Sequence, residues 1–481
     1  MIVYTKVRRW VFDNFLYNYN IILNTMRNIY LTLILFILTG PFLFGQSLFD
    51  NLTSEAPADD AKKTSFELSG FARGVVHGGA KDFDYSNAFG EFALKGRFEK
   101  QKAFLYADMR VREGIFYNNR ELQLQLKEAY AGYRGDKIDL FLGNQIVTWG
   151  RTDGFNPTNN ITPNDYFFLT YEPDDQKLPN FMLRTKIKPT NTLDIELIAI
   201  PFYKPSVYRY ELFDMGQFGF FDLSDAIYFA EVDSPKLRFD KGSLAARFNL
   251  ETSSVSLAAS YFIGHNPFYG FTLDNFTLSP LAVNFMPKPY FMQTIGADFA
   301  LPVKSWIIRG EMALNLTKDY EAAMNIPNPD FSYVVGVEKS FWDIMAIFQY
   351  VGKYTFNFKE LKSPMLTGFT PDAIQQYATD MALFESTKYN RKIFNQQEET
   401  NHMLFLSLNR SFFYEQLNVE LSGTYNITTE EHLVRSRVKW NLTDAVSANI
   451  GCNFMLGPDE SIFHLAGNVM NGVFLGLEVG F

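Results

Sequence analysis

The chain is poor in the residues from which catalytic and metal-binding sites are usually built. Its 481 residues include one cysteine, Cys452, and five histidines. A single cysteine excludes an intramolecular disulfide and a metal site made of cysteines. The histidines are scattered without the spacing of metal ligands, and the Gly-x-Ser-x-Gly motif of many hydrolases does not occur. The sequence therefore predicts no metal site, no cofactor and no catalytic residues.

An excess of basic charge is also lacking. The 44 Lys and Arg residues are outnumbered by 53 Asp and Glu residues, which gives a formal net charge of −9. Residues 1–45 contain four basic side chains and one acidic side chain, so the rest of the chain carries −12. Nucleic-acid binding depends on basic patches that neutralise phosphates. We therefore expect no nucleic-acid partner.

Only one long apolar run occurs, Ile29–Phe44, and it follows Arg27. A basic residue, an apolar stretch and a small residue before a polar segment are typical of a secretory signal peptide. We interpret residues 1–45 as this peptide, cleaved after Gly45, with residues 1–25 added by a start codon assigned too early. An N-terminal membrane anchor is the alternative. Residues 46–64 are polar and small, and are predicted to form a flexible periplasmic leader.

Aromatic residues, in contrast, are abundant, and they fall in alternating segments. The chain is 17% aromatic, with 49 Phe and 26 Tyr, while its hydrophobic fraction is an ordinary 47%. The last ten residues place Val473, Leu475, Leu477, Val479 and Phe481 on one side of an extended strand. A strand that is apolar on one face and ends in an aromatic is typical of outer-membrane barrels, although a half-buried strand of a soluble sheet is the alternative.

Residues 65–481 contain about 18 segments of this kind, each near the length of a tilted membrane-spanning strand. Short connections alternate with long ones, of which the longest are 149–179, 203–235, 265–288 and 354–399. One change of phase predicts a β-bulge near Lys127. We therefore predict an all-β fold, a transmembrane antiparallel β-barrel of about 18 strands (16 is the alternative), with short periplasmic turns and long extracellular loops.

The segment that follows the fifth predicted strand carries a family resemblance. It resembles an uncharacterised group of bacterial outer-membrane β-barrels with a GxQxVxWGxxDG…NPxD segment. The matching positions are Glu128–Tyr130, Tyr133–Asp136, Gly143, Gln145, Val147, Trp149, Gly150, Asp153, Gly154 and Pro163–Asp165. Asn144 stands where the family usually has Arg. The resemblance covers about 40 residues, implies a porin-like or transporter barrel in the outer membrane, and supplies no agreed substrate.

Residues 149–179 form the third outer loop of the predicted barrel. In porins this loop folds into the lumen, and we predict that it forms the constriction here, while a loop lying flat over the mouth is the alternative. The residues that we assign to this constriction loop are Trp149, Arg151, Asp153, Asp165, Glu172, Asp174 and Asp175.

Basic side chains are predicted to line the lumen opposite this acidic loop, because charge repeated at every second position cannot face lipid. They are Arg73, Lys95, Arg97, Arg110, Arg112, Arg435, Arg437 and Lys439. Such an arrangement selects solutes through pore-lining charge. The alternative is that these charges pair with acidic residues of neighbouring strands.

The pattern favours a porin-like channel for passive or substrate-selective diffusion of small solutes across the outer membrane of a Gram-negative bacterium. A structural or export-accessory barrel is the alternative, and an outer-membrane enzyme is disfavoured. The expected partners are outer-membrane lipid, the barrel assembly machinery, which reads Phe481, and an unidentified solute, with the protein a homotrimer or a monomer.

Overall fold

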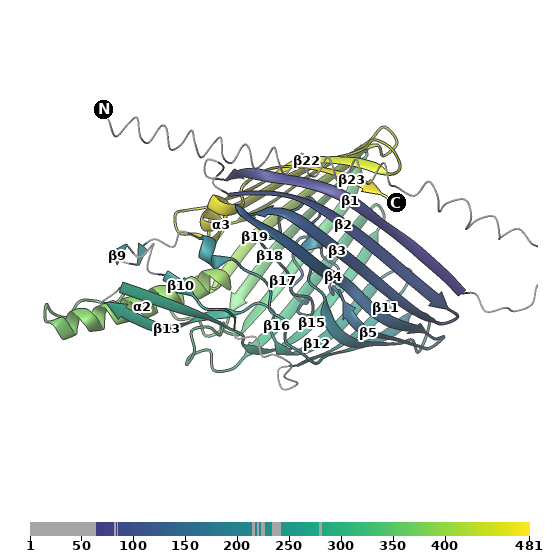
Figure 1. The fold of residues 1–481 in the computed structure, drawn as a ribbon. Helices are drawn as coiled ribbons and strands as arrows, with labels where there is room; N and C mark the ends of the chain where they lie inside the picture. Colours follow the sequence, from purple (N-terminus) through teal and green to yellow (C-terminus); the bar gives the residue numbers. More distant parts are fainter. Residues whose placement is uncertain are drawn as a thin grey trace, which may run out of the picture. The chain divides into compact units, whose positions relative to one another are not determined.

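The computed structural model describes residues 64–80, 83, 85–213, 217–218, 221–222, 227–232, 242–278 and 281–481. The predicted signal peptide and all but the last residue of the predicted leader lie outside these residues. Within them, the chain folds into a barrel closed by antiparallel strands (Figure 1).

The barrel has 18 strands, which confirms the predicted class and strand number. Each strand pairs with the next along the chain, and the last pairs with the first. The strands are β1 (Thr64–Ala80), β2 (Tyr85–Lys100), β3 (Ala103–Phe116), β4 (Asn119–Arg134), β5 (Ile138–Gln145), β6 (Asn180–Ile187), β7 (Leu193–Ile200), β11 (Ser243–Glu251), β12 (Ser256–His265), β15 (Phe291–Val303), β16 (Trp306–Thr317), β17 (Asp330–Phe341), β18 (Ile344–Thr355), β19 (Thr400–Phe412), β20 (Leu417–Asn426), β21 (Glu431–Asn441), β22 (Val446–Leu456) and β23 (Gly472–Gly480).

The alternation in the sequence separates the two faces of the barrel wall. On β23, Leu475 and Leu477 are 59% and 51% exposed on the outside, whereas Phe474 is 2% exposed on the inside. The pairing of β23 with β1, from Phe71 with Gly480 to Gly79 with Gly472, closes the barrel. This pairing leaves no free edge at the seam, which an open sheet would expose.

The predicted bulge lies at Lys127. Asp108 of β3 pairs with Glu128 of β4, but the next residue, Met109, pairs with Leu126, so Lys127 has no partner across the strand. The bulge turns the Lys127 side chain inward, where it is 3% exposed. It also keeps the leucines of β4 on the outside after the phase of the sequence changes.

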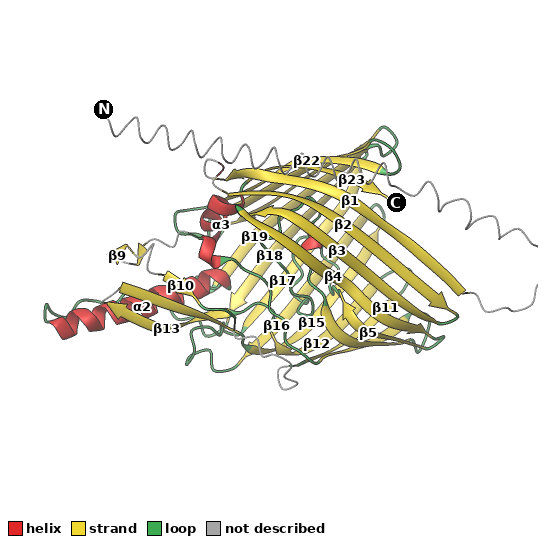
Figure 2. Cartoon of the chain, in the orientation of Figure 1, coloured by secondary structure: helices red, strands yellow, loops and turns green. Residues whose placement is uncertain are grey.

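The two ends of the barrel differ, as Figure 2 shows. At one end, which we call the turn end, the strands are joined by short connections such as 101–102, 304–305 and 342–343. At the other, which we call the mouth, lie α2 (Pro371–Ile393), α3 (Ile462–Met470) and a small sheet of β10 (Ile227–Phe229), β13 (Gly270–Leu278) and β14 (Leu281–Lys288). Two two-residue strands, β8 (Gln217–Phe218) and β9 (Phe221–Asp222), pair with each other.

Two details of the mouth differ from the sequence analysis. Residues 354–399 contain the helix α2, which begins after Thr370, and the Thr370 hydroxyl accepts a hydrogen bond from the Ala373 amide. The helix continues to Ile393 because Tyr389 and Asn390 are buried against the mouth sheet. Residues 265–288 contain the β13–β14 hairpin rather than loop alone.

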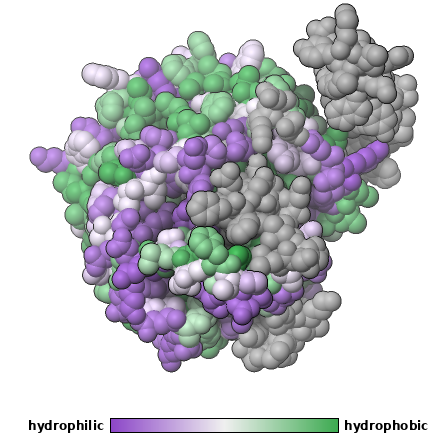
Figure 3. All heavy atoms as spheres, turned by 90° about the vertical axis from the view of Figure 1, so that its left-hand side faces the viewer, coloured by the Kyte–Doolittle hydropathy of each residue, from purple (hydrophilic) through white to green (hydrophobic). Residues whose placement is uncertain are grey.

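The described residues contain no helix of the length and apolarity needed to cross a membrane. Seen from the mouth, hydrophilic side chains are spread over the middle and lower part of the molecule, and apolar side chains gather along its upper part (Figure 3).

Candidate functional site: a loop across the barrel lumen

The chain leaves the barrel wall at the end of β5 and runs through the barrel interior before it returns at β6. We call residues 146–179 the lumen loop. Gly150 turns it inward with φ +104°, a conformation that L side chains rarely adopt. A Cβ atom at this position would lie 2.5 Å from Oε2 of Glu311, so the sequence also needs glycine there for space.

The first part of the loop is held by Glu311, an inward-facing residue of β16 that is 1% exposed. Its carboxylate accepts hydrogen bonds from the Arg151 amide (3.2 Å), the Thr152 hydroxyl (2.9 Å), and both the amide (2.9 Å) and the hydroxyl (2.7 Å) of Thr158. One buried carboxylate thus satisfies four donors, which makes it the principal anchor of residues 151–158.

Three predicted constriction residues lie near this anchor, each paired with the wall. Trp149 donates its indole N–H to Glu196 of β7 at 2.7 Å. Arg151 lies 2.7 Å from Asp298 of β15 and 3.1 Å from Glu251 of β11. Asp153 accepts from Arg309 of β16 at 3.1 Å. The acidic partners on the strands were not identified from the sequence, although Glu196 and Glu311 fall on the polar faces of their strands.

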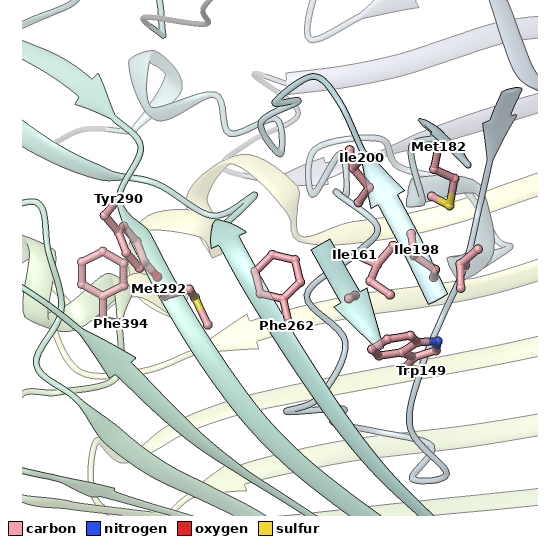
Figure 4. Close-up of a cluster of buried hydrophobic side chains, with 11 residues drawn as sticks. Trp149, Ile161, Met182, Ile198, Ile200, Phe262, Tyr290, Met292 and Phe394 are labelled. Atoms are coloured by element: carbon pink, nitrogen blue, oxygen red, sulfur yellow. The ribbon is translucent and has the colours of Figure 1, made fainter. Parts of the chain in front are cut away.

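Apolar packing fixes the same part of the loop. Trp149 and Ile161 lie in a buried cluster with Met182 and Ile198 from β6 and β7 (Figure 4). The cluster continues along the inner face of the wall to Phe394 at the mouth. Ile161 is 0% exposed. Burial of side chains this large stabilises the inward path by about 1.5–3 kcal/mol each.

The second part of the loop is held by Asp175, in the 3-10 turn η2 (Pro173–Gln176). Its carboxylate lies 2.7 Å from Arg73 of β1 and 2.8 Å from Arg110 of β3. Burial alone would raise the pKa of this carboxyl, but the attraction of the two arginines and their hydrogen bonds lower it to about 2. Asp175 is therefore ionised at neutral pH.

These arginines belong to a buried ion-pair network. Arg73 pairs with Glu91 at 2.5 Å, Arg112 with Glu91 at 3.1 Å, and Arg110 with Asp108 at 3.0 Å. The three arginines and their three carboxylate partners balance one another. Arg73, Arg110 and Arg112 are 5%, 7% and 4% exposed, so they anchor the loop rather than present charge to an open lumen. The three arginines are thus paired with carboxylates, as the alternative in the sequence analysis has it, and their action on a solute stays a prediction.

The barrel seam holds the loop from another side. Arg437 of β21 lies 2.7 Å from Glu172, and Arg435 donates to the backbone carbonyl of Tyr171 at 3.0 Å. The Tyr171 hydroxyl donates to Glu478 of β23 at 2.7 Å. Two strands near the seam, β21 and β23, thus contact Tyr171 and Glu172.

The remaining predicted residues are placed as follows. Lys95 and Arg97 extend along the inner face of β2, over the rings of Phe71 and Phe104. Lys439 lies two residues beyond Arg437 on β21, on the same face. Asp165 is partly buried, which raises the pKa of its carboxyl, and accepts a hydrogen bond from the Phe167 amide. Asp174 is exposed and pairs with Lys177 at 2.9 Å. Whether they act on a solute stays a prediction.

The two anchors lie on opposite sides of the barrel. Glu311 stands on β16, whereas Arg73 stands on β1, and the strand order separates these strands by about half of the circumference on either side. The loop therefore crosses the lumen instead of lying over the mouth. Lys127, turned inward by the bulge, supports the crossing by donating to the backbone carbonyls of Asp175 (2.7 Å) and Lys177 (2.5 Å).

Neither a family model nor a curated protein matches this chain. Among solved structures, the fold is similar to that of Pseudomonas aeruginosa OpdK crystallised with vanillate, at 8% identity and a TM-score of 0.49 over 86% of this chain and 98% of that chain. P. aeruginosa OccK5 (OpdH) gives 8% identity and a TM-score of 0.48 over 86% and 97%. Acinetobacter baumannii OccAB2 gives 10% and 0.47 over 87% and 98%.

These identities and TM-scores are low, and the architecture described above rests on the strand pairing of this chain itself. That pairing defines the class, a closed 18-stranded antiparallel β-barrel with a loop across its lumen.

Proposed function

We propose that this protein is a porin-like channel of the Gram-negative outer membrane, through which small solutes diffuse, and that the lumen loop forms its constriction. The observation that carries the proposal is the crossing of the barrel by residues 151–175, held by Glu311 on one side and by Arg73 and Arg110 on the other. A closed barrel with an apolar outside needs no further segment to be stable in a membrane. A lumen loop that crosses the barrel and is anchored on both sides therefore points to control of which solutes pass through the lumen.

Selectivity in this proposal comes from the space that the loop leaves and from the charges that it does not neutralise. Most acidic side chains of the loop are matched by a wall cation, as Glu172 is by Arg437. Lys95, Arg97 and Lys439 lie further toward the turn end of the wall. Arg97 pairs with Glu99 at 3.1 Å, so it is the two lysines that can attract anionic solutes. Pore-lining charge of this kind sets the preference for ion sign.

The test is single-channel recording in planar bilayers with the purified barrel. We expect discrete conductance steps, which become larger when residues 155–170 are replaced by a short Gly-Ser linker that leaves both anchors in the chain. A matched control shortens the β13–β14 hairpin at the mouth, and should leave the step size unchanged. A folded barrel without any conductance would overturn the channel.

A structural or export-accessory barrel is the second candidate, favoured by the number of contacts that tie the loop to opposite walls. It predicts a folded barrel that is silent in bilayers, and conducts only after the anchors are removed. We propose no enzymatic activity. Lipase and protease assays on the purified barrel, with the five histidines substituted one at a time, test this statement, because an activity lost with one histidine would overturn it.

Membrane placement and partners follow from the same proposal. The signal peptide, residues 1–45, directs export, the barrel assembly machinery reads the last strand and Phe481, and lipid covers the apolar outside. Crosslinking in outer membranes distinguishes a monomer from a homotrimer.

A further inference from the structure

The barrel wall has a gap beside the mouth half of β4. This strand has 16 residues, whereas its neighbour β5 has 8. Residues 119–128 of β4 pair with β3, with Lys127 bulged out, but only Ala129–Arg134 pair with β5. The chain leaves the wall at the end of β5, and no other described strand takes its place. Half of β4 is therefore a strand edge in an otherwise closed barrel.

This edge lies at the depth of the membrane. On the outside of the wall, Arg120 and Glu113 form an exposed ion pair of 2.7 Å, which marks the polar zone near the mouth. Leu122, Leu124 and Leu126 follow toward the turn end, on the same face, and are 67%, 78% and 43% exposed. Backbone that is neither paired nor hydrated is costly in hydrocarbon, and is tolerated only where it lines a cavity or is covered by protein.

A cavity of about 270 Å³ opens at this edge. Its lining joins the two faces of the wall, since Leu124 points outward whereas Arg112, Gln123 and Gln125 point inward. The inner side is formed by Phe167 and Phe168 of the lumen loop, together with Arg209. A cavity that contains residues of both faces of a strand extends around its edge, and so connects the outside of the wall to its inside.

The chemistry of the lining is amphipathic. Arg112 is 4% exposed, stacks on the ring of Phe168 at 4.2 Å, and its Nη2 has no hydrogen-bond partner among the described residues. The Oε1 atom of Gln125 is also buried without a partner there. The charged residues of the lining are Arg112, whose Nε already pairs with Glu91 while its Nη2 does not, together with Arg209 and Asp165. Unpaired donors of a buried guanidinium favour an anionic group, and the rings and leucines beside it favour an apolar chain.

We propose that this gap is a lateral portal, through which a single-chain amphiphile with an anionic head group passes between the membrane and the barrel interior. The head group binds beside Arg112 and Arg209, and the chain lies along the outer leucines of β4. The volume is just below the range of about 300–1,000 Å³ of small-molecule sites, which suits one head group and a short part of one chain. The inference takes the membrane placement of the barrel from the proposed function, but it does not require an open pore.

The test uses dodecanoate as the probe, titrated calorimetrically into the purified full-length barrel in phosphatidylcholine nanodiscs. Leu124→Trp fills the cavity from the outside, whereas Leu122→Trp, at the preceding outward position, does not line it. We expect Leu124→Trp to weaken binding by at least about tenfold, a loss of about 1.4 kcal/mol, and Leu122→Trp to bind like the original protein. Arg209→Gln should weaken dodecanoate but leave uncharged dodecanol unaffected.

Equal binding to both tryptophan variants, or no saturable binding of dodecanoate to the original barrel, would overturn the portal. Heat-modifiable migration in electrophoresis verifies that each variant is folded. Single-channel conductance in KCl, measured on the same samples, separates the two proposals. A barrel that conducts but does not bind dodecanoate contradicts the portal alone, whereas a barrel that binds dodecanoate without conducting contradicts the open channel alone.

Discussion

Arg110 donates a 2.8 Å hydrogen bond to Oδ1 of Asp175, a residue 65 positions further along the chain. Arg110 faces inward from β3, in the barrel wall, while Asp175 lies in the loop that crosses the lumen. The same carboxylate lies 2.7 Å from Arg73 on β1. One aspartate thus fixes the loop to two strands, and the position of the loop becomes sensitive to the charge of this single side chain.

Asp175→Asn should detach the second part of the lumen loop. Removal of one partner of a buried ion pair costs about 3–5 kcal/mol, because the charges left behind remain buried and unpaired. We expect larger and noisier single-channel conductance, with the barrel still folded. Asp174→Asn is the matched control. The Asp174 side chain is 85% exposed, and it pairs with Lys177, three residues further along the same loop, and not with the barrel wall. Equal conductance of both variants would show that Asp175 is not an anchor.

The same anchor predicts a response to acid. The pKa of Asp175 in the folded barrel is about 2, below the ordinary value of 3.8. A depressed pKa stabilises the folded state above the ordinary value, and this contribution is lost as the pH falls from about 4 toward 2. We expect constant channel noise from pH 7 to pH 5, and an increase below about pH 4. Asp175→Asn should lack this transition, and an unchanged transition in that variant would assign it to another group.

Glu311→Ala should release the first part of the loop. The substitution leaves the four donors from Arg151, Thr152 and Thr158 without their acceptor, at a cost of about 1–3 kcal/mol for each buried donor that remains unsatisfied. Limited proteolysis of the purified barrel should then cut within residues 151–158. Glu338→Ala is the control: this residue of β17 pairs with Arg309 of the preceding strand, at 2.7 Å, but does not itself bond the loop backbone. Cleavage at the same rate in both variants would contradict the role of Glu311.

Most of the barrel wall could be predicted from the sequence because each strand reveals its own two faces. Lipid and lumen impose opposite polarity on alternate residues, so the strand number and the bulge at Lys127 follow from local patterns. Loops are not subject to this alternation. The β13–β14 hairpin and the full length of α2 therefore depend on packing at the mouth, where Asn390 bonds the backbone of Phe271.

The site could be predicted only in part. The sequence identifies Arg73 and Arg110 as inward-facing and Asp175 as a residue of the third outer loop, but not that they meet. Their pairing depends on how far the loop reaches across the barrel, and that distance is set by Glu311 and the cluster around Ile161 on the far wall. The gap beside β4 also depends on the path of the loop. The chain leaves the wall at the end of β5, so the mouth half of β4 has no pairing strand on that side among the described residues.

Removal of Phe481 should reduce assembly rather than conductance. The backbone of Phe481 makes two hydrogen bonds with Gly70, at 2.9 and 3.0 Å, and its ring stacks near Phe92 with centroids 5.8 Å apart. Their loss weakens the seam by about 1–2 kcal/mol and removes the aromatic terminus that we expect the assembly machinery to read. The folded fraction in outer membranes, measured by heat-modifiable migration, should fall.

Phe66→Ala, which removes another exposed ring from the outside of β1, is the control and should assemble normally. A normal yield of the truncated barrel would show that the terminal phenylalanine has no role in assembly. Channels that form in low yield but conduct normally would show that Phe481 acts during assembly and not in the pore.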